Sequence, residues 1–424
     1  MESITSVKGF KDILPAEAEK WQYIESVARD IFRNFGIREI RIPLLEKTDL
    51  FKRGIGESTD IVEKEMYTFI DRGHEQLSLR PEATASVIRA YLEHTMYMSE
   101  SVSKLFTIGP MFRRERPQKG RFRQFHQINV EVIGAGEPFV DAELILMLMH
   151  FLQSLDLRDL KLEINSLGCP VCRPVFRQKI VSYLTGKEGQ LCQDCVRRLQ
   201  SNPLRIYDCK VEGCRKVIAS APVMLDDVCP DCRDHFEKVL AFLGIFEAPF
   251  QINPHMVRGL DYYTRTAFEV TTESLGAQNA VAGGGRYDGL VRLLGGPDLP
   301  GIGFAVGLER LAALVPLKEA EVTSRPQIFI AVLGEVARVW SFTLCNYFRM
   351  LGIRAETGSS DKSLKSQMKQ SDRLGSLYTL ILGDKEIQEK SAELRDMESG
   401  IQETVSLDNF DSLAELIMNK TEER

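Results

Sequence analysis

Two periods of hydrophobic and polar residues alternate along the first part of the chain. Apolar residues recur at helical spacing between residues 21 and 35, which predicts an amphipathic helix. Residues 37–42 then alternate as a strand, which ends at Pro43 because proline lacks the N–H that a strand interior needs. A second short strand over residues 77–79 is followed by a helical pattern over residues 82–94.

A hairpin and a small α/β unit complete the predicted elements. Residues 104–110 and 125–133 are expected to form two strands that a strongly charged loop joins. A helix is expected over residues 308–315, and a short linker over residues 321–326. The chain then alternates as in a small α/β domain, with strands expected over residues 328–333 and 377–382 and helices over residues 336–351 and 362–374.

Composition divides the chain into three parts. Cysteine pairs and several prolines distinguish residues 166–245 from their surroundings, and a pattern of strands and glycines resumes at about residue 252. We therefore expect an inserted module over residues 166–245, between two halves of one domain at residues 1–165 and 246–322. A separate α/β domain is expected over residues 326–424.

Length and charge exclude several classes of protein. The 424 residues are 44% hydrophobic and 27% charged, as in ordinary globular proteins. The longest apolar run, at residues 144–149, is too short to cross a bilayer, and the first ten residues lack the apolar core of a signal peptide. The net charge of −6 argues against a broadly basic surface. We expect a cytoplasmic protein with neither a membrane nor DNA among its partners.

The cysteines are concentrated in the predicted module. Eight of the nine lie between Cys169 and Cys232, in pairs with the short spacings typical of metal ligands. In a reducing compartment such pairs favour metal over disulfides. Four pairs suffice for two four-cysteine sites that hold structural Zn²⁺, and the alternative is a core of reduced thiols or a partly lost metal site. The candidate ligands are Cys169, Cys172, Cys192, Cys195, Cys209, Cys214, Cys229 and Cys232.

The loop between the two hairpin strands is strongly basic. Residues 113–123 contain six basic side chains, Lys119 among them, against the single carboxylate of Glu115. Guanidinium groups bind phosphate oxygens in pairs, so the loop suits a polyphosphate or a nucleic-acid backbone. The alternative is a solvated hairpin tip. Position favours binding, because Arg113 directly follows an apolar strand and should project from a rigid element.

Two further segments carry polar groups on predicted strands. Gln127, Asn129 and Glu131 share one face of the returning strand, which indicates either the lining of a site or a satisfied polar core. Charged and aromatic side chains are also unusually dense over residues 257–270. Neither a phosphate-binding loop nor a dinucleotide fingerprint is present, so any nucleotide must be held by arginine side chains on a sheet.

Together these motifs closely resemble those of the histidyl-tRNA synthetases, a family of class II aminoacyl-tRNA synthetases, across nearly the whole chain. The matching segments are GFKD (9–12), FKRGIGESTDIVEKEMYTF (51–69), LRPEATA (79–85), GPMFRRERPQKGRFRQFHQ (109–127), RGLDYYTRTAFE (258–269), GGGRYDGL (283–290) and GFAVGLERL (303–311). The resemblance implies an α+β class II synthetase core, an antiparallel sheet flanked by helices, with a Cys-rich insertion and a C-terminal α/β anticodon-binding domain.

The resemblance also implies the reaction and its substrates. Histidine and ATP form histidyl-adenylate and pyrophosphate, and the histidyl group then passes to the 3′-OH of tRNA(His). Arg113 and Arg258 would act at the α-phosphate, and Arg121 and Arg310 at the outer phosphates, which Mg²⁺ would bridge. Phe125 would stack on the adenine, and Glu115 would meet its amino group.

Histidine recognition is implied for a second set of residues. Glu82, Thr84 and Gln127 would bind the α-amino group, and Glu131 and Tyr263 the two imidazole nitrogens, with Tyr262 in the same site. A site of buried polar partners rejects other amino acids, since these leave the partners unpaired. Glu82 equally suits a helix N-terminus. Position 83 is alanine where many relatives have glycine, and its methyl group is expected to tighten the pocket.

The resemblance also implies a role for the C-terminal domain and a quaternary structure. Lys362, Lys365, Lys369 and Arg373 form one basic helix face, which fits either an RNA-binding surface or a solvated one. Homodimers are expected, with the segment that ends at Pro43 near the interface. Two rivals are a histidine-sensing regulatory subunit of histidine biosynthesis and a class II synthetase for another amino acid. The retained arginines oppose the first rival, and Glu131 with the RGLDYY segment opposes the second.

Overall fold

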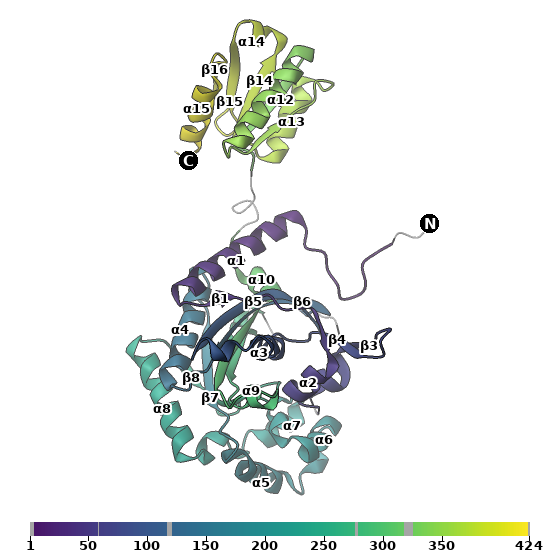
Figure 1. The fold of residues 1–424 in the computed structure, drawn as a ribbon, viewed down its shortest axis with the longest axis vertical. Coiled ribbons are helices and arrows are strands. Elements are labelled where there is room, and N and C mark those ends of the chain that lie inside the picture. Colours follow the sequence, from purple (N-terminus) through teal and green to yellow (C-terminus); the bar gives the residue numbers. More distant parts are fainter. Residues whose placement is uncertain (1–3, 58, 117–120, 276–278, 318–324, 423–424) are drawn as a thin grey trace. The chain divides into compact units, whose positions relative to one another are not determined.

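The computed structural model describes residues 4–57, 59–116, 121–275, 279–317 and 325–422, which fall into two units divided between Glu321 and Val322. The first unit contains an eight-stranded sheet and a small three-stranded sheet (Figure 1). The strands are β1 (Arg38–Glu39), β2 (Leu45–Lys47), β3 (Tyr67–Ile70), β4 (Gln76–Leu79), β5 (Ser103–Phe112), β6 (Gln124–Ile133), β7 (Lys161–Ser166), β8 (Phe250–Ile252), β9 (Thr264–Thr271), β10 (Ala280–Arg286) and β11 (Gly301–Gly307).

Some helices of the first unit cover the two faces of the large sheet, and others pack around a separate core. The helices described in this unit are α1 (Pro15–Asn34), α2 (Thr48–Ile55), α3 (Thr84–Glu93), α4 (Pro138–Ser154), α5 (Cys172–Leu184), α6 (Gln193–Ser201), α7 (Glu212–Ile218), α8 (Pro230–Ile245), α9 (Leu290–Leu293) and α10 (Leu308–Leu314). Short helical turns are η1 (Ile61–Glu65), η2 (Met96–Met98), η3 (Glu188–Gln190), η4 (Pro203–Asp208), η5 (Met224–Asp227) and η6 (Glu273–Leu275).

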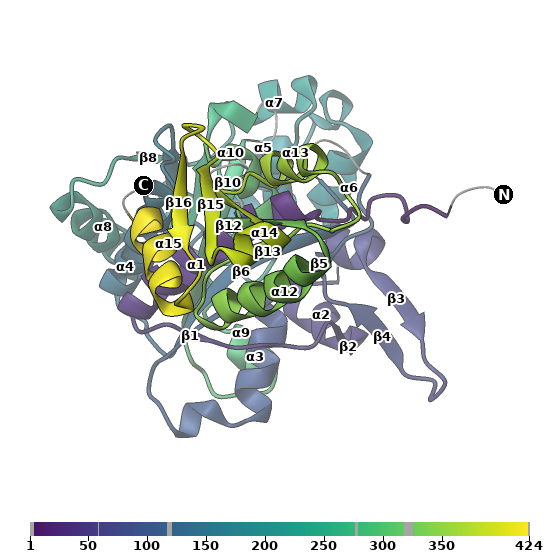
Figure 2. The same cartoon turned by 90° about the horizontal axis from the view of Figure 1, so that it is seen from above.

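The large sheet runs in the order β1-β5-β6-β11-β10-β9-β7-β8. Its strands pair antiparallel except at the two edges, where β1 is parallel to β5 and β8 is parallel to β7. The small sheet, β2-β4-β3, is antiparallel throughout, and Figure 2 shows β3 and β4 as a projecting hairpin. The expected antiparallel sheet flanked by helices is therefore confirmed, with parallel edge strands in addition.

Period-two alternation on β6 separates the hydrophobic core from the polar face. Ile128, Val130 and Val132 are buried in the main core, together with apolar residues of α1, α4, α8 and α10. Residues 127, 129 and 131 point to the opposite face, as predicted. On that face, α3 and α9 pack around Tyr91 and Tyr287.

The observed helix boundaries differ from the predicted ones for physical reasons. Helix α1 begins at Pro15, because proline at the first helical position needs no N–H partner. Helix α3 begins at Thr84, since the Glu82 carboxylate accepts the N–H groups of the first turn. The apolar run at residues 144–149 lies inside α4, which is packed between the sheet and α8. Within the described ranges, no helix combines the length and apolar character needed to span a bilayer.

Residues between β7 and β8 form a helical region with a core of its own. Helices α5, α6 and α7 group together in both views, around a cluster that contains the eight cysteines (Figures 1 and 2). The first turn of α8 contributes Cys232 to this cluster, and from Phe236 onward the helix packs in the main core.

The second unit is a five-stranded sheet in the order β13-β12-β14-β15-β16. Strands β13, β12 and β14 are parallel, and β15 and β16 extend the sheet antiparallel. The predicted strand over residues 328–333 is confirmed, and the elements after β14 were not predicted. The bounds are β12 (Ile328–Leu333), α12 (Glu335–Met350), β13 (Ala355–Thr357), α13 (Leu364–Leu374), β14 (Tyr378–Gly383), α14 (Asp384–Gln388), β15 (Ser391–Asp396), β16 (Gln402–Ser406) and α15 (Phe410–Glu422).

Candidate active site

One cleft of about 610 Å³ on the polar face of the large sheet collects all the predicted substrate-binding residues. Its floor consists of β6, β10 and β11, and its walls come from the segments before α3, after β5 and before β9. The predicted residues that line it are Glu82, Thr84, Arg113, Glu115, Arg121, Phe125, Gln127, Glu131, Arg258, Tyr262, Tyr263 and Arg310. Lys119 lies outside the described residues.

Glu131 is the most deeply buried carboxyl group of the cleft. It is 1% exposed, and its two oxygens accept hydrogen bonds of 2.7 Å from the hydroxyls of Thr84 and Tyr287. Burial raises the pKa of Glu131 to about 8, although the two hydrogen bonds favour the ionised form. A carboxyl group with this pKa can either accept or supply a proton near neutral pH.

Glu82 lies beside Glu131 and also serves the fold. Its oxygens accept the N–H groups of Thr84 and Ala85 at 2.7 and 2.9 Å, as the helix N-terminus alternative predicts, and the side chain also lines the cleft. Burial raises the pKa of Glu82, and these bonds together with nearby Arg113 work in the opposite direction. The Tyr262 hydroxyl donates to Glu82 at 3.4 Å.

Gln127 offers an acceptor that the described residues leave open. Its side-chain oxygen is buried without a hydrogen-bond partner in the described part of the chain, although the side chain lines the cleft. A buried acceptor without a partner costs free energy, so a ligand that donates an N–H here would be favoured.

Four arginines and Lys210 line the remainder of the cleft beside the carboxylates of Glu115, Asp208, Glu269 and Glu309, and each arginine is held by the fold. Arg113 donates to the carbonyl of Pro81 at 2.8 Å and lies over the Phe125 ring at 5.3 Å. Arg258 pairs with Glu269 at 2.9 Å and lies over the Tyr263 ring.

Arg310 and Arg121 are the other two arginines that line the cleft. Arg310 donates to the carbonyl of Ala280 at 2.7 Å. Burial and the neighbouring charge of Arg121 lower the pKa of Arg310. Glu115 forms an ion pair with Arg121 at 2.7 Å, so the contact with adenine that the resemblance implies requires this pair to open.

Glycines of the two central strands make room for these side chains. A Cβ atom at Gly283 would lie 2.6 Å from the Arg258 guanidinium, and one at Gly303 would collide with the Glu131 carboxylate. The glycine-rich segments therefore allow the site's own side chains to lie flat on the sheet. Ala83 does not line the cleft as described; its methyl group packs with Val87 and Met111 beside it.

Tyr287 is a site residue that the sequence did not reveal. It follows β10 directly, in the glycine-rich segment at residues 283–290, and reaches Glu131 across a separation of 156 residues. A buried tyrosine normally needs a hydrogen-bond partner, so its place between glycines was a signal, but the sequence did not indicate which partner.

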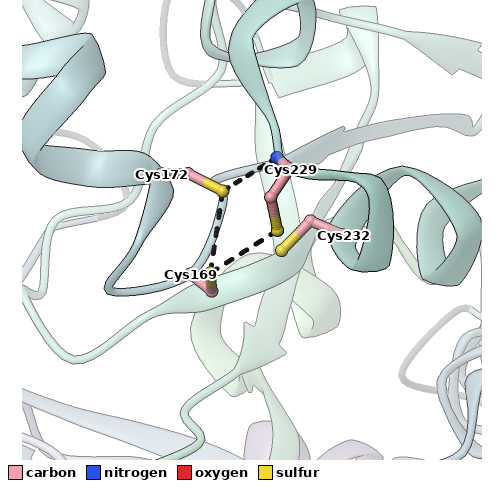
Figure 3. Close-up of side chains that lie close together, drawn as sticks. All are labelled: Cys169, Cys172, Cys229 and Cys232. Atoms are coloured by element: carbon pink, nitrogen blue, oxygen red, sulfur yellow. Dashed lines mark hydrogen bonds between the residues drawn. The ribbon is translucent and has the colours of Figure 1, made fainter.

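The eight clustered cysteines form two groups of four, and none of them lines the cleft. One group contains Cys169, Cys172, Cys229 and Cys232 (Figure 3); the other contains Cys192, Cys195, Cys209 and Cys214. Within each group the sulfur atoms lie within 4.8 Å of one another. All eight are free thiols.

The sulfur geometry fits a tetrahedral metal site. The sulfur of Cys169 lies 3.6 Å from that of Cys172 and 3.9 Å from that of Cys229, and the Cys192–Cys209 distance is 3.8 Å. Four sulfurs at 2.3 Å from Zn²⁺ are separated by about 3.8 Å, whereas a disulfide requires about 2.05 Å. Backbone N–H groups also donate at 3.1 Å to one sulfur in each group, as a thiolate requires.

Comparison with known proteins identifies the family. Residues 9–311 match the family model described as histidyl-tRNA synthetase, and residues 327–415 match an anticodon binding domain. A histidine–tRNA ligase of Desulfatibacillum aliphaticivorans is 54% identical over 98% of this chain and 99% of its own. One from Trichlorobacter lovleyi is 53% identical over 96% of each. The crystal structure of apo S. aureus histidyl-tRNA synthetase is 37% identical, with a TM-score of 0.82 over 98% of this chain and all of that one.

The sheet with its arginine-lined cleft, together with the matched anticodon-binding domain, defines an aminoacyl-tRNA synthetase. Similarity to the relatives extends along both units, with no large region left unmatched. The chain belongs to the histidyl-tRNA synthetase family. The resemblance inferred from the sequence motifs is therefore confirmed.

Proposed function

We propose that the cleft joins histidine to tRNA(His) in two steps. An oxygen of the histidine carboxylate attacks the α-phosphorus of ATP, the bond to the β-phosphate breaks, and pyrophosphate leaves. The terminal 3′-OH of the tRNA then attacks the carbonyl carbon of histidyl-adenylate and loses its proton, and AMP leaves. Phosphoryl transfer of this kind depends on positioning and charge stabilisation, for which the cleft is suited.

One observation supports this function above the others: a single cleft has a buried polar end and a row of four arginines. In the polar end, Glu131 and Tyr263 would hold the imidazole nitrogens, and Tyr262 would fix Glu82 beside them. Glu82, Thr84 and Gln127 would hold the α-amino group, since the Gln127 oxygen has no other donor among the described residues.

The arginines would bind ATP. Arg113 and Arg258 flank the polar end and would hold the α-phosphate as charge shifts during attack. Arg121 and Arg310 would hold the outer phosphates, and Mg²⁺ would bridge them. Phe125, which lies against the Arg113 guanidinium, would stack on the adenine. Glu115 would accept a hydrogen bond from the adenine amino group.

The remaining assignments extend beyond the cleft. We assign residues 1–165 and 246–322 to the catalytic core, residues 166–245 to an insertion and residues 326–424 to anticodon binding. Helix α13 exposes Lys365, Lys369 and Arg373, and Lys362 is exposed just before the helix begins at Leu364, which makes this segment a candidate RNA surface. A cytoplasmic homodimer, with the segment that ends at Pro43 near the interface, completes the proposal.

Each four-cysteine group would hold one structural Zn²⁺. The sulfur spacing and the N–H donors fit this ion, which would stabilise the insertion and take no part in acyl transfer. Metal analysis of the purified protein tests this assignment. We expect two zinc ions per chain, and a metal-free protein with full stability would refute it.

Histidine-dependent exchange of pyrophosphate into ATP tests the activity. We expect exchange with histidine alone among the amino acids, and none with the Arg258→Ala variant. The matched control is Arg292→Ala, an exposed arginine on α9 that pairs only with Asp298 in the described contacts. Histidine binding without exchange would favour the regulatory-subunit alternative instead.

A further inference from the structure

The segment that carries Arg258, Tyr262 and Tyr263 has little secondary structure of its own. Residues 253–263 form an irregular loop between β8 and β9. The backbone bonds described for it run from the Asn253 N–H to Ile164, from the Met256 N–H to Asn253 and from the Asp261 N–H to Ile55. A loop with so few backbone bonds depends on neighbouring elements for its conformation.

The cysteine-containing region supplies the missing contacts. Arg205 donates to the carbonyl of Gly259 at 3.0 Å, and Arg173 donates to the carbonyl of Asp261 at 3.2 Å. The Asn202 amide donates to the Asp261 carboxylate at 2.9 Å. These three bonds therefore hold the segment immediately after Arg258 and immediately before Tyr262.

The same region contacts a second part of the core. Arg198 pairs with Asp60 at 3.0 Å, and Arg205 lies 3.7 Å from the same carboxylate. Asp60 precedes η1, whose Ile61 lines the cleft. Elements α6 and η4 thus contact two separate walls of the active site.

The second cysteine group closes the chain around Arg198, Asn202 and Arg205, whereas Arg173 directly follows Cys172 of the first group. Helix α6 follows Cys192 directly, and Asn202 and Arg205 both lie between Cys195 and Cys209. Helix α6 has nine residues and η4 has six, lengths at which isolated helices are marginal in water. A metal ion bound by all four thiols would fix both elements at their ends.

We propose that the site formed by Cys192, Cys195, Cys209 and Cys214 takes a thiophilic divalent cation, Zn²⁺, and thereby positions the 253–263 loop for histidine activation. This inference rests on the proposed function and adds a task for the metal beyond stabilising the insertion. Asn202 and Arg205 act as positioning residues, because they contact the loop and are not among the residues that line the cleft. A displacement of about 1 Å at a reacting group costs roughly 100-fold in rate, so losing the metal should lower kcat for exchange about 10- to 100-fold.

The central experiment exchanges the two side chains of the Asn202–Asp261 hydrogen bond, which joins the residue between α6 and η4 to the loop. In the full-length protein, Asn202→Asp places two carboxylates together and should lower kcat for pyrophosphate exchange about tenfold while both zinc ions stay bound. Adding Asp261→Asn restores a donor and an acceptor, and should restore most of the rate. Arg197→Ala is the matched control, since Arg197 lies on α6 but pairs only with Asp194 in the described contacts. Failure of the exchanged pair to recover activity would overturn the positioning role.

Metal removal provides the second test. Cys209→Ala should leave one zinc ion per chain and lower kcat at least as far as Asn202→Asp, and the double variant should be no slower than Cys209→Ala alone. If Cys209→Ala does not fold, chelation of the wild-type protein followed by readdition of Zn²⁺ should abolish and then restore exchange. Full exchange after loss of that ion would refute this inference and leave the proposed function intact. Wild-type protein that holds two zinc ions but shows no exchange would refute the proposed function itself.

Discussion

Replacing Glu131 by glutamine should have opposite effects on stability and on activity. The pKa of Glu131 is about 8 in the folded protein against 4.5 in a model compound, because burial disfavours the charged form. Well below pH 4.5 the carboxyl is protonated in both the folded and the unfolded protein, so it does not lower the free energy of unfolding. As the pH rises from 4.5 to 8, the folded state loses stability, and above pH 8 the loss is constant.

The size of the effect follows from the two pKa values. The wild-type carboxyl destabilises the fold by about 1 kcal/mol at pH 5 and by about 5 kcal/mol at pH 8.5. Glutamine does not ionise, so the stability of Glu131→Gln relative to wild type should rise by about 4 kcal/mol between these pH values. Any fixed cost of burying the amide cancels in this difference.

Urea unfolding without substrates measures this difference. Trp21 and Trp340 lie in different units, so a Trp340→Phe background reports fluorescence from the first unit alone. Glu163→Gln on β7, which lies outside the residues that line the cleft, is the matched substitution, measured at the same pH values.

The same variant should bind histidine more weakly. Above pH 8, where Glu131 is ionised, a hydrogen bond to this charged group contributes about 1.5–3 kcal/mol, so Glu131→Gln should raise the KM for histidine about 10- to 150-fold in pyrophosphate exchange at pH 8.5. An unchanged KM would mean that Glu131 does not bind the substrate. A stability difference that does not vary with pH would mean that burial does not control this carboxyl.

Three further substitutions test other parts of the structure. Tyr287→Phe removes one of the two donors to Glu131 and should raise the KM for histidine about tenfold, with a smaller change in kcat. A tenfold fall in kcat with an unchanged KM would contradict a binding role. Gly303→Ala places a methyl group against the Glu131 carboxylate, and calorimetry should show no heat of histidine binding, whereas wild-type affinity would contradict the geometry. Asp141→Asn leaves the fully buried Arg286 without its closest partner and should lower the free energy of unfolding by about 3–5 kcal/mol in urea titrations; a loss below 1 kcal/mol would show that Asp288 suffices.

Local periodicity explains which parts of the fold were predictable. The alternation on β6 correctly separated Ile128 and Val130 from Gln127 and Glu131, because one strand with two different faces fixes its own orientation. Helix α4 is apolar on all sides, so its sequence has no period that distinguishes a helix from a buried strand.

Contacts between distant residues explain what was not predictable. The cysteine spacings indicated four pairs, but not which pairs belong together. Cys169 and Cys229 belong to one group, and all four cysteines of the second group lie between them in the sequence. Nothing local to either pair specifies that arrangement. The Tyr287–Glu131 bond likewise depends on how β10 and β6 align through β11.

The glycines beneath the site limit how amino acid specificity can change. A Cβ atom at residue 303 would collide with the Glu131 carboxylate and would lie 2.5 Å from the backbone oxygen of Val130, so a smaller residue at position 131 does not by itself make room there. Position 283 differs, because the nearest atoms that a Cβ would meet all belong to the flexible Arg258 side chain. Attempts to engineer a synthetase for a histidine analogue should therefore keep glycine at position 303 and diversify position 131, because libraries that vary residue 303 will contain mostly inactive clones.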